Sequence, residues 1–299
     1  MTKNSVLKGV FLVGLGATSY GMLATFVKLA YKEHFTTAEV TSSQFILGII
    51  GVLLINTFQK FKKRNDVVKA TSNNVFQLML AGTSLGMTSV FYYLCVKYID
   101  VSIAIVLLMQ TVWMGVLVEM FLDKKLPSTQ KMVSVAIVLL GTVLATNLMN
   151  NTTKIDWHGI IWGIFAAASF TTTMFTASRV ATNISSAQRS LYMLLGGAVI
   201  VFGFSIATQD LSTFNFDIFF KWGIVLSLFG TIIPPMLMNA GFPSTGIGLG
   251  SIVSSLELPV SVLMAFFILK EQVVPIQWFG IVLIITAIVI MNLNFKKKN

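Results

Sequence analysis

The stretches FLDKKLPSTQ (residues 121–130) and LKEQVVPIQW (residues 269–278) lie 148 residues apart and follow one pattern. In each, an acidic residue comes at the end of an apolar run, a proline follows four positions later, and another apolar run begins. The same shift places Gly48 on Gly196. Chance similarity between apolar segments does not explain shared acids, prolines and glycines, so an internal repeat is predicted. A repeat that serves only helix packing is the alternative to a functional one.

The composition places these apolar runs in a membrane. Of the 299 residues, 55% are hydrophobic and 11% are charged, whereas a soluble domain has roughly 25% charged residues. A soluble globule and a disordered chain are therefore excluded, and Cys95, the single cysteine, excludes a disulfide-linked secreted module. The runs are also longer than the alternating segments of about ten residues that build transmembrane barrels. We therefore predict a membrane protein made of helices.

Ten apolar segments are candidate membrane spans, since a helix needs about 20 residues to cross about 30 Å of hydrocarbon. They cover approximately residues 9–31, 38–58, 76–97, 101–122, 130–149, 159–179, 186–208, 219–240, 246–268 and 276–294. Each half of the repeat, residues 1–150 and residues 151–299, contains five of them. Because five is odd, the second half enters the membrane in the opposite orientation, and such repeats form a substrate site where they meet near the bilayer midplane. The predicted fold is an all-α membrane protein with ten transmembrane helices arranged as two inverted five-helix repeats.

The net charge of +10 lies mainly in the loops beside the spans. Basic residues cluster between residues 60 and 69 and again at Lys296, Lys297 and Lys298, and most of the 21 basic residues fall on one side of the predicted topology. Basic loops remain in the cytoplasm and attract anionic lipid headgroups. We therefore predict a multi-pass protein of the plasma (inner) membrane with both termini cytoplasmic. Nucleic acid is not an expected partner.

Three stretches carry a resemblance to a known family. They are KGVFLVGLGATSYGMLATFVKLAY (8–31), LLMQTVWMGVLVEMFLDKKLPSTQKMVSVAIVLLGTVLATNL (107–148) and SSLELPVSVLMAFFILKEQVVPIQWFGIVLIITAIVIMNL (254–293). They resemble the EamA-type transporters of the drug/metabolite transporter superfamily, and the resemblance extends over essentially the whole chain. It implies that residues 1–150 and 151–299 are two EamA-type repeats, with spans 1–4 and 6–9 around a central cavity and spans 5 and 10 at the periphery. It also implies export or exchange of a small metabolite, an amino acid or a similar polar or amphipathic solute, by alternating access.

Glu257 is the first candidate for a functional residue. It lies at the middle of the segment 246–268, about 15 Å from either membrane surface at 1.5 Å per residue. An ionised acid at that depth costs about 3 kcal/mol, so it must face a wet cavity, find a partner or stay protonated. Pro259 removes a backbone donor from the adjacent turn. We predict that Glu257 is a cavity residue that couples transport to a proton or binds a cation. A protonated glutamate that only joins helices is the alternative.

Further candidates are polar or aromatic side chains near the middle of other predicted spans. The predicted cavity residues besides Glu257 are Tyr20, Thr25, Tyr92, Gln110, Trp113, Ser169, Asn239 and Ser254. Hydroxyls of this kind also bond to their own helix backbone, and a buried tryptophan often serves only packing, so both alternatives remain. Pro234, Pro235 and Pro259 are predicted to kink their spans, as gating requires, or to form static kinks. Gly82 and Gly86 lie in the stretch of span 3 that matches Pro234 and Pro235, and a bend is expected there too.

No catalytic residue, metal site or cofactor is predicted. His34 and His158 are far apart, and no metal-ligand spacing, phosphate-binding loop or nucleophile motif is present in the sequence. The expected partners are a small-molecule substrate, the lipid bilayer and protons. A channel or a lipid flippase is the alternative function, and a membrane-embedded enzyme is a weaker one.

Overall fold

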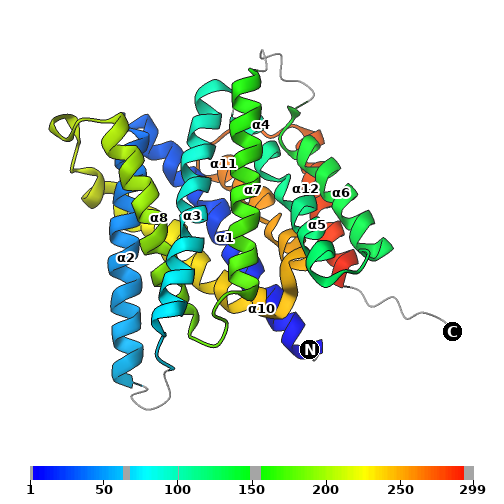
Figure 1. Cartoon of the computed structure of the whole chain (residues 1–299). Helices are drawn as coiled ribbons and strands as arrows, with labels where there is room; N and C mark the ends of the chain where they lie inside the picture. The colour runs from blue at the N-terminus through cyan, green and yellow to red at the C-terminus, as the bar shows by residue number, and fades with distance from the viewer. Residues whose placement is uncertain (1–2, 63–67, 100, 149–155, 293–299) are drawn as a thin grey trace.

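The computed structural model describes residues 3–62, 68–99, 101–148 and 156–292, and every regular element in these ranges is a helix (Figure 1). The elements in chain order are α1 (Lys3–Lys32), α2 (Thr37–Lys62), α3 (Ser72–Tyr98), α4 (Val101–Leu108), α5 (Thr111–Asp123), α6 (Thr129–Ala145), α7 (Trp157–Arg179), α8 (Ser186–Thr208), the 3₁₀ turn η2 (Leu211–Thr213), the π-helical turn η3 (Phe219–Gly223), α9 (Ile224–Ser227), the π-helical turn η4 (Leu228–Ile232), α10 (Ile233–Ser254), α11 (Glu257–Phe267) and α12 (Pro275–Asn292). The prediction of an all-helical protein is confirmed. Of the residues behind the predicted orientation, Lys63, Arg64, Lys154 and Lys296 to Lys298 lie outside the described ranges.

Most of these helices can cross a membrane. Within the described ranges, seven helical stretches are long and apolar enough, and two shorter apolar helices, Thr129–Ala145 and Pro275–Met291, accompany them. The seventh stretch, Phe219–Phe267, has 49 residues, more than twice the roughly 20 that one crossing needs. It is interrupted at Gly246, whose backbone angles are φ 72° and ψ 179°. Only glycine adopts this conformation without strain, and the chain changes direction there (Figure 1).

The fourth and ninth predicted spans are each divided into two helices. The turn between α10 and α11 precedes Pro259, which has no N–H for the carbonyl of Ser255. The turn between α4 and α5 contains no proline, but both turns have short-range bonds, such as Gln110 N to Leu107 O at 3.1 Å and Leu256 N to Val253 O at 3.1 Å. Thr111 lies 148 residues before Pro259, so the two breaks occupy matching places.

Short polar side chains begin several of the helices. The caps that accept a backbone N–H are Thr71 before α3, Ser128 before α6, Asp156 before α7 and Ser185 before α8. Each satisfies one of the N–H groups that a helix leaves unpaired at its start. The Asp156 carboxylate accepts the N–H of His158 at 2.9 Å and also contacts its ring, and these hydrogen bonds lower the pKa of Asp156.

The main helix contacts join the first part of the chain to the second. In this way α1 packs on α10, α2 on α8, α3 on α7 and α8, and α6 on α12. Glycines allow the closest approach: a Cβ on Gly82 would collide with the backbone of Met193, and one on Gly196 with the backbone of Met79. Helix α3 runs without interruption through Gly82. We expected a bend in this stretch; the helix is continuous there, and Gly82 serves close packing against α8.

Arg189 is a buried charge inside this packing. It is 1% exposed and lies in the first turn of α8. Its guanidinium donates to the backbone oxygens of Val180 (3.0 Å), Asn239 (2.5 Å), Thr176 (2.9 Å) and Ala177 (2.7 Å). Three of these carbonyls lie at the end of α7, where a helix leaves its last carbonyls unpaired. Arg189 therefore ties the end of α7 to α8 and α10.

Candidate functional site

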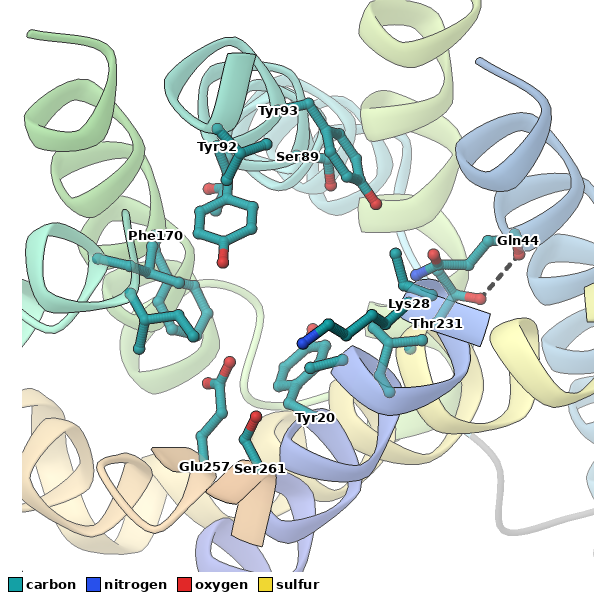
Figure 2. Close-up of a pocket in the computed structure, with 18 of the residues that line it drawn as sticks. Tyr20, Lys28, Gln44, Ser89, Tyr92, Tyr93, Phe170, Thr231, Glu257 and Ser261 are labelled. Atoms are coloured by element: carbon teal, nitrogen blue, oxygen red, sulfur yellow. Dashed lines mark hydrogen bonds between the residues drawn. The ribbon is translucent and has the colours of Figure 1, made fainter. Parts of the chain in front are cut away.

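A cavity of about 240 Å³ lies where the two parts of the chain meet. Its walls come from α1, α2, α3 and α4 on one side and from α7, η4 and α11 on the other. The polar and aromatic residues of the lining are Tyr20, Lys28, Tyr31, Gln44, Phe45, Thr88, Ser89, Tyr92, Tyr93, Phe170, Thr231, Glu257 and Ser261. Figure 2 shows most of these side chains turned toward a shared space.

Glu257 is the acidic residue of this cavity. It occupies the first turn of α11, and its carboxylate points into the space opposite the hydroxyl of Tyr92 (Figure 2). Its Oε2 is buried and has no hydrogen-bond partner among the described residues. Three other buried side-chain atoms of these residues share that condition, on Gln188, Trp222 and Asn239, and none of the three lines this cavity. Of these four groups, the Glu257 carboxylate is therefore the one that faces the cavity.

Aromatic rings surround the carboxylate. Tyr20 on α1 meets Phe170 on α7 edge to face, with ring centroids 6.2 Å apart. Tyr92 and Tyr93 on α3 also meet edge to face at 6.2 Å. Tyr20, Tyr92, Tyr93 and Phe170 all line the cavity, which has an apolar body with few polar groups, as is usual for small-molecule sites.

Lys28 marks the place where the cavity reaches the surface. Its side chain is 50% exposed, lines the cavity, and lies 2.5 Å from Glu271. Glu271 comes from the connection between α11 and α12, so this ion pair joins α1 to the end of α11. The charge of Lys28 is therefore matched by a carboxylate, in contrast to Glu257.

The opposite end of the cavity is closed by packed side chains. On the N-terminal side of Tyr20, Val13 of α1 belongs to a buried cluster with Met238, Phe242 and Val253. In the same region Gly9 of α1 comes so close to α10 that a Cβ would lie 2.9 Å from the carbonyl oxygen of Gly241. A solute in the cavity therefore meets an apolar barrier on this side.

Three of the nine predicted cavity residues line the cavity, namely Tyr20, Tyr92 and Glu257. Gln110 and Trp113 do not: Gln110 bonds to Val106 O at 3.0 Å and accepts the Trp113 indole N–H at 2.8 Å. The break before α5 turns both side chains toward each other.

The other four predicted residues are used in packing. Thr25 is 2% exposed within α1. Ser169 donates to Ser84 O at 2.9 Å, and Ser254 donates to Gly250 O at 2.9 Å in its own helix. Asn239 donates to Ser190 at 2.9 Å and borders a separate space of about 20 Å³.

The prolines predicted to kink the spans lie at helix starts. Pro234 and Pro235 are the second and third residues of α10, which continues directly from the π-helical turn η4, so their missing N–H groups remove donors where the span departs from regular α-helical geometry. The irregularity lies before them, in the π-helical turn η4, and again at Gly246. Pro259 follows the turn between α10 and α11 and lies two residues after Glu257.

Our sequence reasoning missed several lining residues, among them Tyr31, Thr88 and Thr231. The spacing of residues along α3 could have identified some of the lining residues. On α3, Ser89, Tyr92, Tyr93 and Val96 follow spacings of three, four and seven, which place them on one helix face. Polar groups and tyrosines repeated in this way on an otherwise apolar span indicate a cavity face.

Comparisons with known proteins give a family and a fold. The model of the EamA-like transporter family matches residues 7–147 and again residues 157–293. No curated protein matches the chain. Among solved structures, one titled "Crystal structure of protein" is 14% identical, with a TM-score of 0.78, and the match covers 97% of this chain and 98% of that one. At this identity the likeness concerns the fold alone.

Proposed function

Because this chain belongs to the EamA-like transporter family, we propose that it carries a small polar or amphipathic metabolite across the membrane by alternating access. The observation that carries this proposal is the cavity between the two family repeats, lined by helices of both and closed at one end by apolar packing. A solute that enters beside Lys28 reaches Tyr20, Tyr92 and Glu257 and leaves only when the barrier moves. A channel requires a continuous polar path, and the apolar barrier argues against one.

We also propose that the two repeats are inverted copies. Four glycines support it: Gly48 and Gly82 match Gly196 and Gly230 at a shift of 148 residues. A Cβ on Gly82 or Gly196 would collide across the contact of α3 and α8. A Cβ on Gly48 or Gly230 would collide with Thr231 or Gln44, across the contact of α2 and η4. Equivalent glycines thus make equivalent close contacts, as expected of halves related by a two-fold axis in the membrane plane.

Two ion pairs support the same symmetry. Lys28 lies 2.5 Å from Glu271, and Arg179 lies 2.5 Å from Asp123. Asp123 and Glu271 match at the 148-residue shift, and the two cations lie near the C-terminal ends of α1 and α7, the first helix of each repeat. The side chains are similarly exposed, at 50% and 40% in the first pair and 47% and 43% in the second. Each pair links one repeat to the other.

In this proposal the chain crosses the membrane ten times. The 49-residue stretch Phe219–Phe267 counts as two crossings divided at Gly246, and α6 and α12 are the two short ones. The N-terminus and the C-terminus lie in the cytoplasm, as the basic residues predict. The cavity then faces the outside and the apolar barrier faces the cytoplasm. The two ion pairs lie at opposite faces of the membrane.

Counterflow in proteoliposomes tests the function. Purified protein is reconstituted with a metabolite mixture trapped inside, and the uptake of each labelled component from outside is measured against protein-free vesicles. We expect saturable uptake of one solute class, accelerated by the same solute on the other side. Uptake that rises linearly with concentration, without acceleration by internal solute, would indicate a channel. No uptake of any component of a mixture that includes amino acids, amines and organic acids would remove the proposal.

A further inference from the structure

The charges and rings of the cavity favour one class of solute. We propose that the cavity binds a small organic cation, with a protonated amine at Glu257 and an apolar body between Tyr20, Tyr92 and Phe170. This inference rests on the proposed function, because it names the substrate class of the same cavity.

The acidic and basic residues of the cavity favour a cationic solute. The lining contains one basic and one acidic side chain, Lys28 and Glu257. The Lys28 ammonium is already matched by Glu271 at 2.5 Å. The buried Oε2 of Glu257 has no partner among the described residues. A buried carboxylate without a partner is costly, and an ammonium group from the solute supplies the charge-assisted hydrogen bonds that the protein does not.

The acids elsewhere in the described chain support this reading by contrast. Glu39 is 2% exposed, yet its oxygens accept bonds from Thr36 N at 2.7 Å and from Asn215 N at 2.7 Å. Glu119 on α5 is paired with Lys131. The fold therefore satisfies these acids internally, whereas Glu257 is left open toward the cavity.

The aromatic rings of the cavity also favour a cationic solute. A cation is attracted to the face of an aromatic ring within about 6 Å of its centroid. Tyr20 and Tyr92 line the cavity with Glu257, and Figure 2 shows the Tyr92 side chain pointing toward the carboxylate with its hydroxyl, and the Phe170 ring beside it. Rings that stabilise an ammonium repel a carboxylate placed at the same point. The combination selects cations over anions of equal size.

The size of the cavity limits the solute. Its volume of about 240 Å³ is below the range of about 300–1,000 Å³ that holds drug-sized ligands. A single ring with a short aminoalkyl chain suits this space, and a large multi-ring cation does not. The expected class is therefore a small aryl or alkyl amine.

A matched set of probes tests the inference by isothermal titration calorimetry on the full chain in lipid nanodiscs at pH 7. The probes share a phenyl ring and a two-carbon chain: 2-phenylethylamine, 2-phenylethanol, 3-phenylpropanoate and phenylalanine. We expect the amine to bind at least tenfold more tightly than the alcohol and the anion, and at least as tightly as the zwitterion. Preference for the anion or the alcohol overturns the proposal. Tenfold tighter binding of phenylalanine also overturns it and indicates that Lys28 binds a carboxylate.

Variants assign the preference to the residues. Glu257→Gln is expected to lower the affinity for 2-phenylethylamine at least tenfold and to leave that for 2-phenylethanol unchanged. Glu119→Gln makes the same change outside the cavity and is the matched control, with no expected effect. Tyr92→Phe keeps the ring and should bind the amine within about threefold of the natural protein, whereas Tyr92→Leu should lose more than threefold. Equal affinities in Glu257→Gln and the natural protein would contradict the assignment, and the probe series decides the class if that variant does not fold.

The outcome is distinguishable from failure of the proposed function. If counterflow detects a transported solute but 2-phenylethylamine binds no better than 2-phenylethanol, the transporter stands and the amine class is wrong. If the amine binds as expected but no solute shows counterflow, the site stands and the transport function is wrong.

Discussion

At the scale of single residues, Gly196 has no room for a side chain. A Cβ there would collide with the backbone of Met79, which cannot move away as a flexible side chain does. We expect Gly196→Ala to lower the free energy of unfolding by about 1–3 kcal/mol through overpacking, measured by denaturant unfolding in detergent. Gly203 on the same helix has nothing within 4 Å of a Cβ, so Gly203→Ala is the control and should stabilise by about 0.5–1 kcal/mol. Equal effects of the two changes would show that α3 and α8 do not approach as described.

Glu257 is also where transport is expected to depend on pH. The other titratable groups that line its cavity are Tyr20, Lys28 and Tyr31 from α1 and Tyr92 and Tyr93 from α3. If its proton takes part in the cycle, Glu257→Gln should keep downhill counterflow but lose accumulation driven by a pH gradient. The measurement is uptake into proteoliposomes with and without an imposed gradient, with Glu119→Gln as control. Unchanged accumulation in Glu257→Gln would assign the residue to solute binding alone.

The sequence identified the cavity residues that differ most from their surroundings. An acid in the middle of a span, Glu257, is so costly that its position alone predicts a polar site. Gln110 has a similar cost, but its amide is satisfied by Val106 O and by the Trp113 indole. These hydrogen bonds of Gln110 depend on the break between α4 and α5, and no proline in the sequence predicts that break. Depth along a span is readable from sequence, whereas the direction of a side chain at a break is not.

At the scale of elements, Arg189 decides how α7 ends. Its four bonds to backbone oxygens cannot be reproduced by lysine, whose ammonium is a single point with three donors. We expect Arg189→Lys to lower the free energy of unfolding by about 2 kcal/mol or more, since buried carbonyls lose partners. Arg179→Lys changes a half-exposed ion pair and should cost less than about 1 kcal/mol. Thermal unfolding of both variants measures the difference in stability. An Arg189→Lys variant as stable as the natural protein would indicate that Arg189 lies at the surface.

The Lys28–Glu271 pair fixes α1 against the end of α11 at the mouth of the cavity. Lys28→Glu places two acids side by side and is expected to slow counterflow several-fold, with a change in stability of less than about 1 kcal/mol because the pair is exposed. The double variant Lys28→Glu with Glu271→Lys restores opposite charges and should recover most of the rate. A double variant as slow as the single one would show that the residues do not act as a pair.

The elements could be predicted well where a span is uniform and poorly where it is irregular. The first, second and third predicted segments correspond to α1, α2 and α3. A long apolar run in lipid must satisfy its own backbone hydrogen bonds, and it does so as a helix. The region from η3 to α11 contains π-helical turns and a glycine at φ 72°, which hydropathy does not register. Pro234 and Pro235 indicated an irregular stretch, but its form depends on contacts with α1 and α2 that are distant in sequence.

At the scale of the whole molecule, the inverted arrangement predicts the side on which each segment lies. Reporter fusions after Asn150 and at the C-terminus should report opposite sides of the membrane, since the second repeat then starts outside and ends inside. Alkaline phosphatase, which is active outside, and a fluorescent protein, which matures inside, give complementary signals. Both fusion points lie outside the described ranges, so the experiment is independent of the helix contacts. Same-side signals would remove both the count of ten crossings and the inverted repeat.

The likeness of the two ion pairs has a thermodynamic consequence for the proposed carrier. Arg179–Asp123 and Lys28–Glu271 have the same N–O distance and nearly the same exposure, so each contributes a similar and small amount, about 0–1 kcal/mol, to holding the two repeats together. Breaking either pair during the proposed cycle would therefore cost about the same, and neither pair alone would set the balance between the outward-facing and inward-facing states. In the proposed carrier, the direction of net transport would then follow the gradients across the membrane.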